Sequence, residues 1–271
     1  MSIHLGIDVG AVSVKGALLL PKQLAQSLLA RGGLPVGLRA LSTPQGRDVA
    51  VVVVRSRRAH GRPLEVTREL LEEVSHALGS EPVAGMALTG SGSDLVAEAL
   101  GVRRCNDFQA CVRAIDLLHP QVRTVFEIGG ETSRYIRLMP DPGSGMLGIV
   151  DYSSNGDCAA GTGSFLDQQA SRLQYAVEEI GGIVAQTERA AQIAGRCSVF
   201  AKSDMVHAQQ RGFRPPEVLR GLCNAVATNF KSAVVKGRVS EPPVAVLGGV
   251  SANSAVVDAL CEVFELQDGA L

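Results

Sequence analysis

The chain opens with Leu5-Gly6-Ile7-Asp8-Val9-Gly10-Ala11-Val12-Ser13-Val14-Lys15, in which one apolar strand pattern ends at an acidic residue and a glycine and a second strand pattern follows. Glycine has no Cβ atom, so the backbone N–H groups of such a turn can approach an anion. Asp8 can hold a metal-bound water beside a phosphate, and Ser13 and Lys15 follow in position to donate to it. Hairpin turns also contain Asp and Gly for purely conformational reasons, so the stretch needs further support.

A second stretch, about 120 residues further on, repeats this pattern. Val125-Phe126-Glu127-Ile128-Gly129-Gly130 is again an apolar strand that carries an acidic residue, ends at glycine and turns into another strand. A repeat over that distance predicts two similar lobes that face each other. We place the first lobe, with the first turn, at residues 1–120 and the second lobe at residues 121–271.

A third glycine turn, Leu247–Asn253, connects the strand predicted at residues 244–247 to a helix predicted at about 252–263. Such a turn lets an adenosine pack against backbone. The chain contains no G-x-x-x-x-G-K-[ST] sequence and no G-x-G-x-x-G after a strand, so it belongs neither to the P-loop proteins nor to the dinucleotide-binding proteins with that fingerprint.

Strand and helix patterns alternate through the rest of the chain, which predicts an α/β fold. Residues 21–48 predict a short helix or an inserted loop. Further strands are predicted at residues 51–55, 83–89, 124–128, 133–139 and 150–152. Helices are predicted at residues 63–78, 93–100, 107–118, 163–173, 176–185, 190–194, 199–208 and 216–235.

The composition is that of a soluble globular protein, with 46% hydrophobic and 20% charged residues and a formal net charge of −1 over 271 residues. No run of 18 apolar residues occurs, and the first residues lack a basic start followed by a signal-type apolar core. We therefore expect a cytoplasmic protein with no membrane partner. A short basic cluster at residues 55–62 indicates a solvated turn rather than a nucleic-acid surface.

The six cysteines are scattered, and this spacing argues against a disulfide framework. Cys158 and Cys197 each stand just before a predicted helix, where the helix dipole stabilises a thiolate and favours metal ligation. Two thiolates cannot complete a four-ligand iron–sulfur cluster, but a symmetric dimer would supply four. The residues alone favour two buried cysteines at helix starts, because lone buried cysteines are common, and Cys223 is expected in the core.

The segment from Cys158 to Leu166 reads Cys-Ala-Ala-Gly-Thr-Gly-Ser-Phe-Leu, and 39 residues later Cys197-Ser-Val-Phe-Ala-Lys-Ser-Asp204 follows. Together they resemble the activators of 2-hydroxyacyl-CoA dehydratases and the ATPase subunits of benzoyl-CoA reductases. The three turns resemble the phosphate-1, phosphate-2 and adenosine motifs of the actin/hexokinase/Hsp70 superfamily. The resemblance covers nearly the whole chain. It implies a two-lobed actin-like ATPase (ribonuclease H-like) fold with mixed sheets and flanking helices.

The resemblance also implies the activity: an ATP-hydrolysing electron donor that activates an acyl-CoA dehydratase or reductase partner at low potential. Cys158 and Cys197 would bind one 4Fe-4S cluster shared by a homodimer, and a ferredoxin or flavodoxin would supply electrons. ATP or ADP with Mg²⁺ would lie between the glycine turns. The catalytic residues implied are Asp8, Glu127 and Glu131, and the nucleotide-binding residues are Gly10, Ser13, Lys15, Gly129, Gly130, Gly248, Gly249 and Asn253.

Three departures from the family pattern matter. The second turn usually reads Gly-Gly-Gln-Asp-x-Lys but here continues as Glu131-Thr132-Ser133-Arg134, which leaves the hydrolysis rate open. The loop before the first cysteine usually reads Met-Asn-Asp-Lys, whereas residues 154–157 read Ser-Asn-Gly-Asp. Members also continue beyond the position of Leu271 into a closing helix, and residues 54–63 resemble the long members that carry two such modules. A fragment of a longer protein is therefore one expectation.

Two other interpretations compete with the electron donor. A small-molecule kinase of the same superfamily would need a catalytic aspartate after a glycine turn, and Asp94 is the candidate. A non-catalytic nucleotide-sensing module would use the cysteines only as core residues. Asp204 and His207 lie one helical turn apart, a spacing more typical of a solvated or capping pair than of metal ligands.

Overall fold

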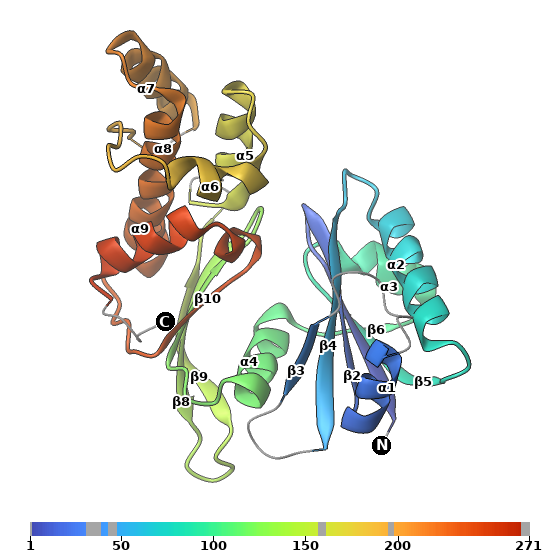
Figure 1. The fold of residues 1–271 in the computed structure, drawn as a ribbon. Coiled ribbons are helices and arrows are strands. Elements are labelled where there is room, and N and C mark those ends of the chain that lie inside the picture. Colours follow the sequence, from blue (N-terminus) through green and yellow to red (C-terminus); the bar gives the residue numbers. More distant parts are fainter. Residues whose placement is uncertain (1, 31–38, 43–47, 157–160, 195–197, 267–271) are drawn as a thin grey trace. The chain divides into compact units, whose positions relative to one another are not determined.

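The structure, a computed structural model, describes residues 2–30, 39–42, 48–156, 161–194 and 198–266. The chain divides into two compact units, Met1–Pro120 and Gln121–Leu271. Each unit is an α/β assembly built around its own sheet (Figure 1).

The sheet of the first unit has six strands in the order β3-β4-β2-β1-β5-β6. The hairpin of β1 and β2 and the β2/β4 and β3/β4 pairs are antiparallel, whereas β5 runs parallel to β1 and β6 parallel to β5. Burial alternates along β1, as expected for a strand with one face in the core. The strands are β1 (Ile3–Val9), β2 (Ser13–Pro21), β3 (Arg39–Ser42), β4 (Val49–Arg58), β5 (Val83–Thr89) and β6 (Arg103–Arg104).

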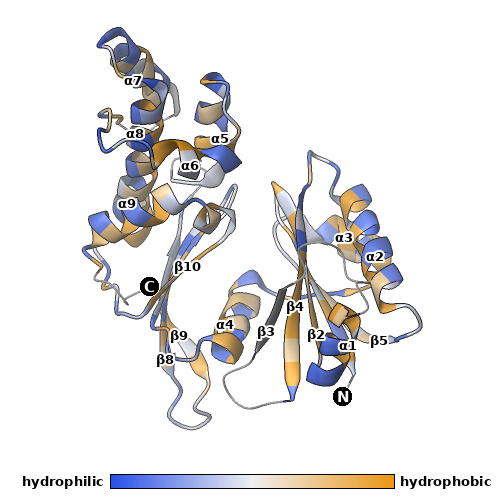
Figure 2. Ribbon diagram, viewed as in Figure 1, coloured by the Kyte–Doolittle hydropathy of each residue, from blue (hydrophilic) through white to orange (hydrophobic). Residues whose placement is uncertain are grey.

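Helices α1 (Lys22–Ala30), α2 (Pro63–Leu78) and α3 (Ser93–Leu100) lie on one face of this sheet (Figure 1). Proline is the first residue of α2, a position whose N–H would have no hydrogen-bond partner within the helix. Figure 2 shows the separate hydrophilic and hydrophobic sides of α2. The side chain of Asn106 accepts from the N–H groups of Phe108 and Gln109 and so caps α4 (Asp107–Leu118).

The sheet of the second unit has four strands in the order β10-β7-β8-β9. Its hairpin, β7 (Thr124–Ile128) and β8 (Ser133–Pro140), is antiparallel, as is the pair of β8 with β9 (Leu147–Ser154). The last strand, β10 (Val244–Leu247), runs parallel to β7. A hairpin followed by a later parallel strand therefore occurs in both units.

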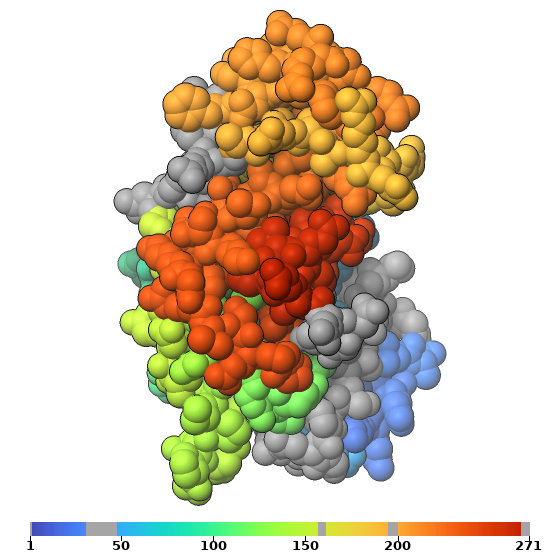
Figure 3. All heavy atoms as spheres, turned by 90° about the vertical axis from the view of Figure 1, so that its left-hand side faces the viewer, coloured from blue at the N-terminus to red at the C-terminus, as the bar shows by residue number. Residues whose placement is uncertain are grey.

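The helical part of the second unit packs on this sheet around a cluster of aromatic rings. Phe126 of β7 contacts Phe230 and Phe264, with ring centroids 5.1 and 4.5 Å apart. Figure 3 shows α9, in red, against the neighbouring orange surface of the chain before it. The helices are α5 (Gly163–Arg172), η1 (Val177–Glu179), α6 (Ile180–Val184), α7 (Ser198–Gln210), α8 (Pro215–Asn229), η2 (Phe230–Val235), η3 (Gly249–Ala252) and α9 (Ser254–Phe264).

Two expected helices differ from the structure. The long helix expected over residues 216–235 is α-helical only to Asn229 and continues as the π-helical η2. Residues 190–194 form no helix, because tertiary contacts hold their backbone: the Ala191 N–H donates to the Glu217 carbonyl over 2.9 Å. The ambiguous stretch 21–48 contains α1 and β3.

Within the part of the chain that the structure describes, no helix is both long and apolar enough to cross a membrane.

Candidate functional site: two equivalent glycine turns

The first turn joins β1 to β2 and is closed by a backbone hydrogen bond from Gly10 N–H to the Ser13 carbonyl, 3.0 Å long. Asp8 and Lys15 lie directly opposite each other in the hairpin, and Lys15 Nζ is 3.1 Å from Asp8 Oδ2. Their side chains are 41% and 37% exposed, so solvent still reaches both charges. The structure thus places Asp8, Gly10, Ser13 and Lys15 together at one turn.

The second turn has the same construction. Gly129 N–H donates to the Thr132 carbonyl over 2.8 Å, and Glu127 faces Arg134 across the hairpin. Arg134 Nη1 is 2.9 Å from Glu127 Oε2, and the two side chains are only 12% and 22% exposed. Because the pair is more buried than Asp8–Lys15, solvent screens its attraction less.

A parallel strand ends behind each hairpin at a glycine with positive φ. Gly90 follows β5 at φ 98°, and a Cβ atom there would lie 2.4 Å from the Val9 carbonyl oxygen. Gly248 follows β10 at φ 88°, and a Cβ atom would lie 2.3 Å from the Ile128 carbonyl oxygen. Only glycine permits both the conformation and the close approach, so each turn is backed by a second glycine turn.

The residues after these two glycines also correspond. Ser93 Oγ donates to the Gly90 carbonyl over 2.6 Å, and Ser251 Oγ donates to the Gly248 carbonyl over 2.7 Å. Asn253 closes the third predicted motif: its Oδ1 accepts from Ala255 N–H and caps α9. Its amide nitrogen Nδ2 is buried and has no hydrogen-bond partner within the described chain. An unsatisfied buried donor fits a ligand acceptor at this turn.

Matching the two hairpins residue by residue identifies two site residues that the sequence motifs did not indicate. Gly10 corresponds to Gly129, so Thr132 stands where Ser13 stands and Arg134 where Lys15 stands. The signal was present in the sequence, since an acid is followed seven residues later by a base in both hairpins. Glu131, predicted as catalytic, lies in the second turn, where its carbonyl accepts from Asn155 Nδ2 over 3.2 Å.

Two carboxylates of the first unit have structural partners. Asp107, which follows the Asn106 cap, accepts from Thr89 Oγ1 over 2.7 Å and from Gly90 N–H over 2.9 Å, and so fixes the turn behind the first hairpin. Asp94, the candidate base of a kinase, forms an exposed ion pair with Arg104 at 3.1 Å.

Cys158 and Cys197 lie outside the described residues. Within the described part of the chain, no three His, Cys, Asp or Glu side chains gather as a metal site. Cys223 is fully buried in the core of the second unit, and burial raises the pKa of its thiol to about 12. This burial confirms the prediction of a core cysteine, and a thiol with that pKa supplies no thiolate near neutral pH.

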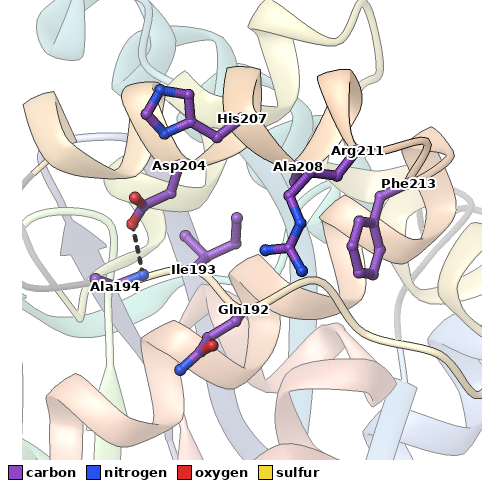
Figure 4. Close-up of a pocket in the computed structure, with 8 residues that line it drawn as sticks. All are labelled: Gln192, Ile193, Ala194, Asp204, His207, Ala208, Arg211 and Phe213. Atoms are coloured by element: carbon purple, nitrogen blue, oxygen red, sulfur yellow. Dashed lines mark hydrogen bonds between the residues drawn. The ribbon is translucent and has the colours of Figure 1, made fainter.

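A pocket of about 350 Å³ lies beside α7, and the residues that line it do not belong to the glycine turns (Figure 4). Asp204 points to the preceding segment and accepts from Ala194 N–H over 2.8 Å, as the dashed line in Figure 4 marks. His207 also lines this pocket, whereas the Asp204 carboxylate is bound by the backbone N–H of Ala194.

The chain is similar to known proteins over most of its length. The chain is 29% identical to the activator of lactoyl-CoA dehydratase of Anaerotignum propionicum over 96% of this chain and 88% of that protein. It is 26% identical to one of the benzoyl-CoA reductase subunits of Thauera aromatica over 87% of this chain and 83% of that protein. Both relatives are therefore matched over most of their length.

The fold matches a solved structure, the activator of 2-hydroxyisocaproyl-CoA dehydratase from Clostridium difficile with bound ADPNP, with a TM-score of 0.72. That match has 22% sequence identity and covers 97% of this chain and 86% of the other. The predicted actin-like ATPase fold, with its mixed sheets and flanking helices, is thus confirmed. The sequence profile of the BadF/BadG/BcrA/BcrD ATPase family matches residues 5–267, and the chain belongs to this ATPase family.

Proposed function

We propose that the chain is an ATP-hydrolysing iron–sulfur electron donor that activates a partner acyl-CoA dehydratase or reductase by single-electron transfer at low potential. The observation that carries the nucleotide half of this proposal is the duplicated glycine turn, with one acid–base pair at each copy. Relatives named as a dehydratase activator and as part of a benzoyl-CoA reductase support the second half.

The glycine turns supply the donors that a nucleotide needs. The backbone at Gly10, Gly129 and Gly130 would approach the phosphates, where the absence of a Cβ atom leaves room for them, with Ser13 and Thr132 adding hydroxyls. Gly248, Gly249 and Asn253 would flank the adenosine, and Nδ2 of Asn253, which has no hydrogen-bond partner among the described residues, fits that role.

The four charged side chains at the turns would take different partners once nucleotide binds. Mg²⁺ would offset the charge of the β- and γ-phosphates, and Asp8 and Glu127 would bind it through water. Lys15 and Arg134, now paired with those acids, would then donate to phosphate. Glu131 is the further candidate catalytic residue of the second turn.

The cluster assignment rests on the two cysteines and their sequence context. Thiolates are the ligands that iron–sulfur clusters take, so Cys158 and Cys197 from each chain of a homodimer would hold one 4Fe-4S cluster. When bound, this group supplies one-electron chemistry. The same proposal includes a ferredoxin or flavodoxin as electron source and a location in the cytoplasm.

Iron and acid-labile sulfide should be measured, with the visible spectrum, on anaerobically purified protein beside two matched variants. We expect about four irons and four sulfides per dimer in the wild type, because a cubane holds that number. Cys158→Ala should lose them, and Cys105→Ala, which removes a partly exposed cysteine of the first unit, should keep them. Iron-free wild-type protein under strict anaerobiosis would refute the cluster.

A further inference from the structure

The pocket beside α7 lies between two segments that are tied to each other. Ala194 N–H donates to Asp204 Oδ2 over 2.8 Å and so joins residues 192–194 to the helix. Phe213 N–H donates to the Ala208 carbonyl over 3.0 Å and so holds Phe213 at the end of the same helix. A volume of about 350 Å³ lies within the range of small-molecule sites, which are usually formed before the ligand arrives.

Part of the pocket lining is apolar. Ile193 and Ala208 contribute to it, and both are buried. The Phe213 ring adds an aromatic surface, and the guanidinium carbon of Arg189 lies 4.1 Å from the centroid of this ring. Because Arg189 is also paired with the buried Glu217 at 3.8 Å, its charge is already offset. The apolar lining can therefore contact the hydrocarbon part of a ligand.

Arg211 brings a positive charge to the pocket, and its guanidinium forms no ion pair with the residues that the structure describes. The acid in the lining, Asp204, is bound by the Ala194 N–H and is not paired with this arginine. Gln192 and His207 also line the pocket, and their side chains form no hydrogen bond with other described residues. Three polar side chains thus remain available to a ligand.

We propose that this pocket binds a small organic carboxylate that carries an apolar group. The carboxylate would take two parallel hydrogen bonds from the Arg211 guanidinium, and the Gln192 amide would add a third. Figure 4 shows the Arg211 side chain extending from α7 toward the segment that carries Gln192. The apolar group would lie against Ile193, Ala208 and Phe213. The site is independent of the proposed nucleotide site, because no residue of the three glycine turns lines it.

The test is an NMR titration of the full chain with phenylacetate, its neutral analogue phenylacetamide, and acetate. We expect phenylacetate to bind with a dissociation constant in the low millimolar range, which suits a ligand of about ten heavy atoms. Phenylacetamide should bind about tenfold more weakly, because it offers no charge to the guanidinium. Acetate should also bind about tenfold more weakly, because it buries no apolar surface. Phenylacetamide that binds as tightly as phenylacetate would overturn the proposal.

Arg211→Gln should weaken the binding of phenylacetate by about tenfold, since it removes a charged hydrogen-bond donor. The matched control is Arg172→Gln, which removes an exposed arginine of α5 outside the pocket and should keep the wild-type affinity. Gln192→Leu, on the other segment, should weaken binding by about threefold and covers the case in which Arg211→Gln does not fold.

Three results would overturn the site. The first is wild-type protein that does not bind phenylacetate at millimolar concentrations. The second is an Arg211→Gln variant that binds it as tightly as Arg172→Gln does. The third is displacement of phenylacetate by ADP, which would assign the anion to the glycine turns. Retained binding of phenylacetate in saturating ADP is the expected result.

Discussion

At the scale of single residues, the two acid–base pairs differ in burial more than in geometry. Arg134–Glu127 is largely buried, whereas Lys15–Asp8 is about 40% exposed. An arginine can donate two parallel hydrogen bonds to one phosphate through its planar guanidinium, a bidentate geometry that the lysine ammonium lacks. Arg134 is therefore the stronger candidate for a phosphate-binding cation.

Removal of this cation should weaken nucleotide binding. We expect Arg134→Gln to lower the affinity for ATP by about tenfold or more, since hydrogen bonds to charged groups contribute roughly 1.5–3 kcal/mol. Arg134→Lys should recover part of that loss. Titration with a fluorescent nucleotide measures the affinity. The control is Arg137→Gln, which changes another arginine of β8 and breaks its ion pair with Glu241. Equal losses in Arg134→Gln and Arg137→Gln would indicate a general effect on β8.

At the scale of elements, Glu217 joins the start of α8 to the segment before α7. Its Oε2 accepts from Arg214 N–H over 2.8 Å, and the Arg214 and Arg189 guanidinium groups lie 3.5 and 3.8 Å from its Oε1. The hydrogen bond from the Arg214 backbone, helped by the two arginines, lowers the pKa of this carboxyl group.

A lowered pKa makes the contribution of Glu217 depend on pH in one direction. The stabilisation is fully present above the ordinary glutamate pKa of about 4.5 and is lost as the pH falls through the lower pKa of the folded state. Glu217→Gln should therefore melt at a lower temperature than wild type at pH 7, with the gap closing as the pH falls below about 4.5. Thermal unfolding followed by circular dichroism tests this, with Glu98→Gln on α3 as control. A gap that stays constant with pH would contradict it.

At the scale of the whole molecule, each unit has a core of its own. One buried cluster includes Leu70 and draws all its residues from the first unit, and the other includes Phe230 and draws all of them from the second. A substitution that disrupts one core should therefore lower the local stability of its own unit first.

Two large-to-small substitutions test this independence. Leu70→Ala should cost about 2–5 kcal/mol and Phe230→Ala about 3–5 kcal/mol, because both side chains are fully buried. Hydrogen exchange read by mass spectrometry should show lost protection in strands of the first unit for Leu70→Ala and of the second for Phe230→Ala. Equal loss across both sheets in either variant would show that the units unfold as one.

Much of this architecture could be predicted from the sequence, because local signals and tertiary packing agree. Pro63 and Gly79 mark the two ends of α2, and Asn106 caps α4 where a helix was predicted. The missed features depend on pairing between segments, within one hairpin for Arg134 and between distant segments for residues 190–194. The register of β7 with β8 sets Arg134 opposite Glu127. A hydrogen bond to α8 holds the backbone of residues 190–194 out of a helical conformation.

Gly248 has a mechanical consequence as well. A Cβ atom at Gly248 would collide with the Ile128 carbonyl oxygen, so the two segments lie in close contact and leave little room to absorb a movement of the second turn. Such a movement is passed on as a rigid shift to η3 and α9, which begin directly after this glycine. Gly90 gives the first turn the same stiff contact with α3. An anion that displaces either turn would therefore also displace the helix packed behind that turn.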